Sequence, residues 1–225
     1  MKQIYGWVWK HVFEEKSAAW TALFTAVLAV VTVQLYRVAN SAHETSRITQ
    51  RAYVSFGGIL PGRKITIATA GTQKVIAIQL IVPWENSGTT PTRNAVSQFN
   101  WQAWPSELPK GFDFPDLPSL AKRIFVIGPK GVASGPLVIP IADMDSVRKR
   151  QSRLFVWGWI TYHDIFEGTR TRLTEFCTEV TNVTSSVEDI TDQTTNISWQ
   201  SIICPDHNCY DEDCSDYEKR TSKSS

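Results

Sequence analysis

Residues 153–166 read RLFVWGWITYHDIF, a run dominated by aromatic and β-branched side chains. Side chains of these types suit the half-buried surface of a sheet, so the run predicts a β-strand. Seven other stretches share this composition and are separated by Gly or Pro: 52–60, 64–70, 74–84, 92–104, 122–127, 137–141 and 169–183. A short helix is expected at 142–150, where acidic residues come first and basic residues last.

Eight strands with no long helix between them predict a mainly β domain over residues 52–183. An antiparallel sandwich and an antiparallel barrel both fit this pattern. We expect the sandwich, of immunoglobulin-like type.

Upstream of this domain, residues 18–36 read AAWTALFTAVLAVVTVQLY and contain no charged side chain. As a helix this stretch would be roughly 28 Å long, close to the thickness of a bilayer's hydrocarbon core. A buried core helix would show a polar stripe, and a cleaved signal peptide would have a shorter apolar core. We therefore predict a transmembrane helix at 18–36, preceded by an interfacial segment at 1–17 and followed by a helical stalk at 37–51.

Charge favours the membrane over nucleic acid as a partner. Lys and Arg number 23 against 22 Asp and Glu, and no long basic run occurs, so nucleic-acid binding is not expected. The basic residues near the predicted span are balanced, three on each side: Lys2, Lys10 and Lys16 before it, and Arg37, Arg47 and Arg51 after it. The N-terminal amine tips this balance, so we expect a bacterial inner-membrane protein with its β domain outside the cytoplasm.

Residues 83–94, PWENSGTTPTRN, raise the question of an anion-binding loop. Phosphate-binding loops need several glycines followed by a helix, whereas Gly88 stands alone here and a strand-type run follows. Asn86 can hydrogen-bond its own backbone, and Pro91 can open a strand. The stretch is therefore predicted to be a connection between two strands.

Four short motifs occur in order along the chain: Arg51-Ala52-Tyr53-Val54, then Asn86-Ser87-Gly88-Thr89-Thr90-Pro91, then Tyr162-His163-Asp164-Ile165-Phe166, and finally Thr174-Glu175-Phe176-Cys177. This order resembles a group of small bacterial single-pass membrane proteins with no established activity. The resemblance covers about 18–183 and implies architecture and membrane location only. The chain departs from the group's pattern by Glu167 before Gly168 and by its long cysteine-bearing tail.

The last predicted hairpin is the densest collection of reactive side chains. With Glu167 and Gly168 as a two-residue turn, Tyr162 would face Leu173 and Trp159 would face Phe176, although a slip of one residue would exchange the faces. A catalytic set of Tyr162, His163, Asp164 and Cys177 is conceivable. Neighbours on a strand point to opposite faces, however, so we expect no catalytic site here.

Residues 101–118 form an aromatic, proline-rich stretch that cannot be a helix or a central strand. We expect a loop that packs across the sheet. The alternative is a surface that binds a protein, a sugar or a peptide, with these aromatic residues as candidates: Trp101, Trp104, Phe112 and Phe114.

Residues 184–225 are predicted to be an acidic, partly disordered tail. Its cysteine spacing, C-x4-C-x4-C, leaves disulfides that include Cys177, a zinc site and free thiols all open. The candidate zinc ligands would be Cys204, His207, Cys209 and Cys214. Zinc sites usually contain C-x2-C pairs, so no metal or cofactor is expected.

These observations favour a membrane-anchored, non-catalytic protein that acts through a protein partner or a homo-oligomer. A ligand-binding module that uses Trp101 and Trp104 is the alternative. A thiol-based redox or metal-binding protein is a third hypothesis, carried by the cysteines.

Overall fold

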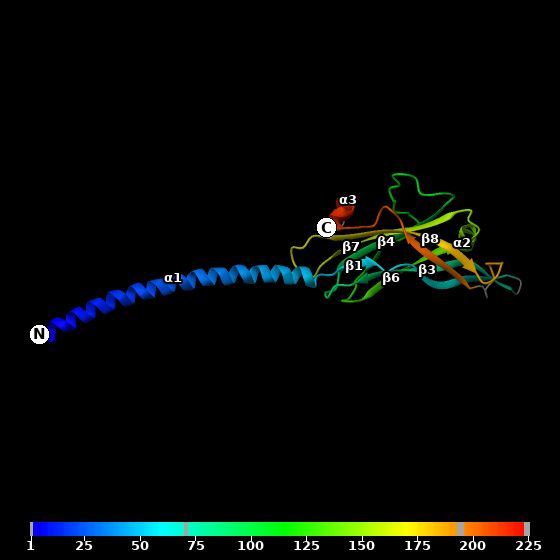
Figure 1. Cartoon of the computed structure of the whole chain (residues 1–225). Coiled ribbons are helices and arrows are strands. Elements are labelled where there is room, and N and C mark those ends of the chain that lie inside the picture. Colours follow the sequence, from blue (N-terminus) through cyan, green and yellow to red (C-terminus); the bar gives the residue numbers. More distant parts are fainter. Residues whose placement is uncertain (1, 70–71, 193–195, 223–225) are drawn as a thin grey trace. The chain divides into compact units, whose positions relative to one another are not determined.

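The computed structural model describes residues 2–69, 72–192 and 196–222 (Figure 1). The chain divides into two compact units, Met1–Thr49 and Gln50–Ser225. Strands hold 43% of the residues and helices 24%, so the protein is mainly β, as the sequence predicts.

The first unit is a single helix. Helix α1 runs from Lys2 to Gln50 without a break, through the predicted interfacial segment, span and stalk. Its part Ala19–Gln50 contains an 18-residue window with a mean hydropathy of 1.8, and none of that window is buried in the structure. The hydroxyls of Thr25 and Thr32 donate to carbonyls one turn earlier, which leaves no unpaired hydroxyl donor at these positions. By length and composition this helix can cross a membrane, a test that a signal sequence also passes.

The second unit begins with a four-stranded antiparallel sheet built around β3 (Thr72–Asn86). On one side β3 pairs with β1 (Val54–Phe56) and β2 (Leu60–Thr69), and on the other with β6 (Val132–Pro140).

A six-stranded antiparallel sheet forms the second layer. Its centre consists of β4 (Arg93–Trp104), β7 (Arg153–His163) and β8 (Arg172–Ser185), and β5 (Arg123–Phe125) pairs with β4. Strands β9 (Ile197–Ile203) and β10 (Cys209–Tyr210) pair with the free side of β8. All eight predicted strands are present with shifted ends.

The tail differs from the prediction. Its described part continues the sheet through β9 and β10 and ends in η1 (Asp211–Asp213) and α3 (Tyr217–Thr221). The acidic composition led to the prediction of disorder. That prediction failed because the short strands β9 and β10 are held by pairing with β8 and by disulfides, and not by an apolar core of their own. Residues 193–195 and 223–225 belong to the predicted tail but lie outside the described residues.

The main core lies between the two sheets. Buried side chains from both sheets form one cluster, in which Trp84 of β3 meets Phe176 of β8 edge to face at 5.4 Å. Phe56 stacks on Phe176 with ring centres 4.0 Å apart. Helix α2 (Ile141–Arg148) adds Met144 and Val147 to this cluster. We call the side of the six-stranded sheet that faces this core its inner face.

The opposite side of the same sheet, its outer face, is also covered. Trp157, Trp159 and Phe155 of β7 are buried there beneath the loop after β4 and the C-terminal segment. In Figure 1, α3 and the green loop lie on the same side of β7. Because both faces are covered, Leu154 to Tyr162 are all buried, which explains the unbroken apolar run in the sequence.

The register of the β7–β8 hairpin is shifted by one residue from the prediction. Tyr162 pairs with Arg172, and Trp159 pairs with Glu175. The connection spans residues 164–171 instead of a two-residue turn. The shift places Glu175 on the outer face and Phe176 on the inner face.

Candidate functional site

The connection at residues 83–94 holds the start of the β domain. The side-chain oxygen of Asn86 accepts hydrogen bonds from the backbone N–H of Tyr53 at 3.1 Å and of Gly88 at 2.9 Å, and its amide donates to the carbonyl of Thr90. A Cβ on Gly88 would lie 2.2 Å from the carbonyl oxygen of Arg51, so only glycine fits. The loop therefore binds its own backbone, which confirms a strand connection.

Residues from the predicted catalytic set serve the same junction. The hydroxyl of Tyr162 accepts a hydrogen bond from the N–H of Val54 at 3.2 Å, and the carboxylate of Asp164 accepts one from the N–H of Ala52 at 3.2 Å. Burial raises the pKa of Tyr162, which makes its deprotonation harder. These contacts show that both side chains position the start of the β domain at β1.

The remaining members of that set lie elsewhere. His163 exchanges a hydrogen bond with the hydroxyl of Thr171 at 3.0 Å. Cys177 is fully buried on the outer face and forms a disulfide with Cys204. The structure therefore does not bring the four side chains together as a nucleophile with its base.

The aromatic stretch 101–118 packs largely onto the protein itself, and its first four residues belong to strand β4, so the prediction that none of it is a central strand was wrong there. Trp101 contacts the main core, while Trp104 and Phe112 pack against the outer-face cluster. Phe112 meets Trp157 edge to face at 5.5 Å. Phe114 is only 7% exposed, so its inclusion in a partner surface was wrong, because it covers the sheet. For the other three, half-buried side chains, a binding role stays a prediction.

The four cysteines form two disulfides, Cys177–Cys204 and Cys209–Cys214. The Cα atoms of the pairs are 5.3 and 5.2 Å apart. The zinc set that included Cys204 is thereby corrected, since the sulfur of Cys204 is bonded to Cys177. The other three candidates, His207, Cys209 and Cys214, do come together around a residue that sequence reasoning missed, Glu175.

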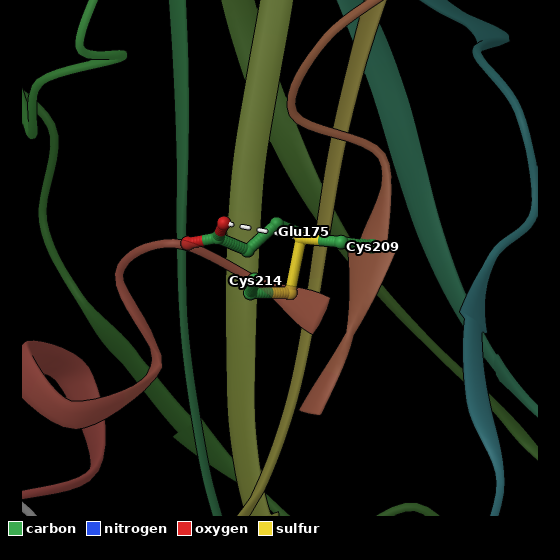
Figure 2. Close-up of side chains that lie close together, drawn as sticks. All are labelled: Glu175, Cys209 and Cys214. Atoms are coloured by element: carbon green, nitrogen blue, oxygen red, sulfur yellow. Dashed lines mark hydrogen bonds between the residues drawn. A yellow bond between two sulfur atoms is a disulfide. The ribbon is translucent and has the colours of Figure 1, made fainter. Parts of the chain in front are cut away.

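Glu175 projects from β8 on the outer face, with 1% of its side chain exposed. One carboxylate oxygen accepts a hydrogen bond from Nε of Arg220 at 2.7 Å. The other lies 3.3 Å from Nδ1 of His207 and 3.4 Å from Sγ of Cys209. Figure 2 draws the approach of Glu175 to the disulfide. A disulfide sulfur carries no hydrogen, so the contact with Cys209 is a close approach and not a hydrogen bond.

Burial controls the protonation of this cluster. It raises the pKa of Glu175, against the opposing effect of Arg220. Burial, followed by the positive charge of Arg220, lowers the pKa of His207 to about 4. The imidazole is therefore neutral near pH 7. Its Nε2 has no hydrogen-bond partner among the described residues.

Arg220 of α3 links the cluster to the aromatic loop. Its guanidinium lies 3.3 Å from the carboxylate of Asp116 and 4.8 Å from the ring centre of Trp159. Asp116 also accepts a hydrogen bond from the indole N–H of Trp159 at 2.7 Å. These contacts bind loop, tail and sheet into one polar network on an otherwise apolar face.

A cavity of about 1100 Å³ opens beside the cluster. Glu175, His207 and Cys209 line one part of it. The remainder is lined by apolar side chains, by the basic residues Lys110 and Arg153, and by several carboxylates, among them Asp206, Asp213 and Asp216. The disulfide is thus reachable from this cavity at Cys209, which is half-buried.

One sequence signal could have found this cluster. Glu175 is a charged residue within the apolar run LTEFC, and a charge inside a strand that is buried on both faces must meet a partner. Arg220 could not be assigned as that partner, because it lies 45 residues farther along the chain, in a short helix that the sequence did not predict.

No family model matches this chain. A search of curated proteins also finds no match. A role for the protein must therefore be argued from its own residues.

Proposed function

We propose that this protein is a single-pass bacterial inner-membrane protein whose β domain performs no catalysis and acts by binding another protein. The apolar helix α1 supports the anchor. The contacts of Tyr162 and Asp164 with backbone groups support a structural role for the hairpin's polar residues.

The observation that carries the proposed contact is a group of exposed aliphatic side chains on and beside β5 and β6. Ile124 is 80% exposed, Val126 66% and Val132 62%. Among the described strands β5 pairs with β4 alone and β6 with β3 alone, so each strand has an open side. Open strand edges with apolar side chains are surfaces that other chains add to.

Covering these side chains would stabilise a complex. Fully burying one Val or Ile side chain is worth about 2 kcal/mol, and the exposed fractions of the three add up to about two side chains, so covering them offers about 4 kcal/mol before the cost of association. Main-chain hydrogen bonds along an open edge would add to this and fix the register of the partner.

The disulfides support a domain outside the cytoplasm, because such bonds persist in oxidising compartments. A contact there would place the partner in the periplasm or in the same membrane.

The test is site-specific photo-crosslinking of the full chain in native membranes. A photoreactive residue at position 124 or 126 is expected to give one discrete product, either with a second copy or with one partner. Position 67 is the matched control, because Ile67 is an exposed aliphatic residue on β2, which lies on the opposite side of β3 from β6. Lysine at 124 and 126 together is expected to lower the yield from a probe at 132 by at least about tenfold, as covered apolar area is lost.

Lysine at position 67 should leave that yield unchanged. A chain that stays monomeric in membranes, with no product from 124, 126 or 132, would refute the proposal.

A further inference from the structure

The Cys209–Cys214 disulfide lies near two side chains of types that serve as metal ligands, Glu175 and His207. The two sulfurs and a carboxylate oxygen of Glu175 all lie within 4.8 Å of one another (Figure 2). Nδ1 of His207 approaches the same carboxylate from the tail. Within the described part of the chain, this is the only such grouping of three or more His, Cys, Asp or Glu ligand atoms.

Two of the separations in the cluster are close to edges of a zinc tetrahedron. With zinc about 2.3 Å from sulfur and about 2.0 Å from nitrogen or oxygen, a sulfur–oxygen edge is about 3.5 Å and a nitrogen–oxygen edge about 3.3 Å. The observed edges are 3.4 Å from Cys209 to Glu175 and 3.3 Å from His207 to Glu175. Two features do not fit without a rearrangement. The two sulfurs are covalently bonded, whereas two zinc-bound thiolates lie about 3.8 Å apart, and His207 lies outside the group of ligand atoms that are within 4.8 Å of one another.

The surroundings already hold the ligands in place. Arg220 binds one oxygen of Glu175 at 2.7 Å, which leaves the other oxygen directed at Cys209 and His207. Phe114 stacks on the imidazole of His207 with its ring centre 4.2 Å away and an interplanar angle of 5°, which fixes the plane of the imidazole. Such outer contacts are what orients the ligands of a metal site.

We propose that reduction of the Cys209–Cys214 disulfide converts this cluster into a tetrahedral zinc site, with Cys209, Cys214, Glu175 and His207 as its ligands. The reductant is a dithiol. One of its sulfurs attacks Cys209 and releases Cys214. Its second sulfur then displaces Cys209, so the dithiol becomes a disulfide and two cysteine thiols remain. Zinc binding to both sulfurs releases their two protons.

The site is accessible to both reactants. Cys209 is half-buried and lines the cavity beside the cluster, through which a dithiol can reach its sulfur. The carboxylates of Asp206, Asp213 and Asp216 line the same cavity and attract a divalent cation. The segment 210–213 between the cysteines is held by the pairing of Tyr210 with Thr174, by the Arg170–Glu212 ion pair and by the contacts of Asp211. The sulfurs therefore separate by rotation of the two cysteine side chains, whose Cα atoms are 5.2 Å apart.

The other disulfide differs in its surroundings. Cys177 and Cys204 lie in an aromatic cluster with Phe155, Trp157 and Phe114, and neither belongs to a metal-binding group in the described residues. The proposal therefore assigns a structural role to Cys177–Cys204 and a metal-binding role to Cys209–Cys214. It is independent of the proposed protein contact at β5 and β6.

The experiment compares oxidised and reduced full-length chain in detergent under anaerobic conditions. Dithiothreitol reduces the protein and is removed by gel filtration. Zn²⁺ is then titrated in competition with a chromophoric chelator, and Co²⁺ serves as the spectroscopic substitute. The reduced chain is expected to bind one Zn²⁺ and to give the visible bands of tetrahedral, thiolate-bound Co²⁺. The oxidised chain is expected to give neither result.

Variants locate the binding. Glu175→Gln should weaken Zn²⁺ binding by at least about tenfold, whereas Glu179→Gln, a carboxylate on the same face of β8, should leave it unchanged. Cys214→Ser should abolish the thiolate bands of Co²⁺ while preserving the Glu175–Arg220 pair, so it tests the site without disturbing that contact. The double variant Cys177→Ser/Cys204→Ser should retain Zn²⁺ binding after reduction.

Three results would overturn the proposal. They are equal Zn²⁺ binding by oxidised and reduced chain, full binding by Cys214→Ser, and loss of binding in the Cys177→Ser/Cys204→Ser chain when its near-ultraviolet circular dichroism is native. Each result would place the bound zinc outside this cluster.

Discussion

The two faces of the six-stranded sheet are covered in different ways. On the inner face, Phe176 and its neighbours pack against a second regular sheet, and the contacts are mainly apolar. On the outer face, Trp157 and Trp159 lie beneath an irregular loop and tail, held by two disulfides and by the network of Glu175 and Arg220.

The inner-face contacts therefore keep the domain folded, whereas the outer-face contacts respond to redox state and pH. Apolar packing is insensitive to redox state and to mild changes of pH, whereas disulfides and buried charges respond to both. We therefore expect chemical conditions to alter the outer face first and to leave the inner face intact.

The largest effect is expected on the inner face. Phe176→Ala removes a ring that stacks on Phe56 and meets Trp84, and it should lower the free energy of unfolding by about 4 kcal/mol. Urea unfolding of the full chain in detergent, followed by tryptophan fluorescence, measures this. The loss should be the same in oxidising and reducing buffer, and a loss confined to reducing buffer would contradict the proposed separation of the two faces.

Removing the disulfide that closes the longer loop on the outer face should lower the free energy of unfolding by nearly as much. Cys177 and Cys204 are 27 residues apart, and removing their bond should cost about 3.5 kcal/mol by chain entropy. Cys209 and Cys214 are 5 residues apart, so replacing both by serine should cost only about 2 kcal/mol. The same urea titrations measure both. The reverse order would show that tail contacts, and not loop closure, govern the outer face.

Acid should weaken the outer face next. The pKa of His207 is about 4 in the folded protein and near 6.5 when unfolded, so the unfolded chain binds more protons between these values. Stability should therefore fall as the pH drops from 6.5 to 4, by up to about 3 kcal/mol from this residue, with less observed because of partial exposure.

Glu175 acts in the opposite sense, because its raised pKa favours proton binding by the folded state and stabilises it as the pH falls. Comparing the oxidised, metal-free wild type with His207→Gln isolates the histidine from Glu175, Arg220 and Asp216. The variant should show a flatter dependence of stability on pH between 4 and 6.5. Parallel profiles would exclude His207 as the source.

The smallest effect is expected from a polar contact on the inner face. The hydroxyl of Thr174 donates to the carbonyl of Val54 at 2.8 Å and so joins β8 to β1. Thr174→Val keeps the shape and should cost about 1 kcal/mol. Its effect should be independent of pH from 4 to 7 and of reductant, and a dependence on either would show that the two faces are coupled.

The sequence predicted the inner face better than the outer face. Runs such as 153–166 are long, strongly β-forming and bounded by Gly or Pro, so all eight strands could be placed. The register of the β7–β8 hairpin was missed because Asp164 leaves the strand to bind the N–H of Ala52. That contact joins residues far apart in sequence, so local turn rules could not reveal it.

The outer-face site was less predictable for a related reason. The sequence named His207, Cys209 and Cys214 as candidates but grouped them with Cys204 instead of Glu175. Cysteine spacing alone cannot choose between pairings. Which cysteines pair depends on the face of β8 from which Cys177 and Glu175 project. That face is set by the strand register, which is known only from the structure.

The C-terminal tail that covers the outer face is synthesised last, and this order has a consequence for biosynthesis. Strands β7 and β8 leave the ribosome before Cys204 and the segment that follows it, so the indoles of Trp157 and Trp159 lack their C-terminal cover while the chain is still emerging. A nascent chain at this stage exposes an apolar surface that is prone to aggregation. The last residues to be synthesised therefore complete the domain, and disulfide formation then ties this cover to the sheet.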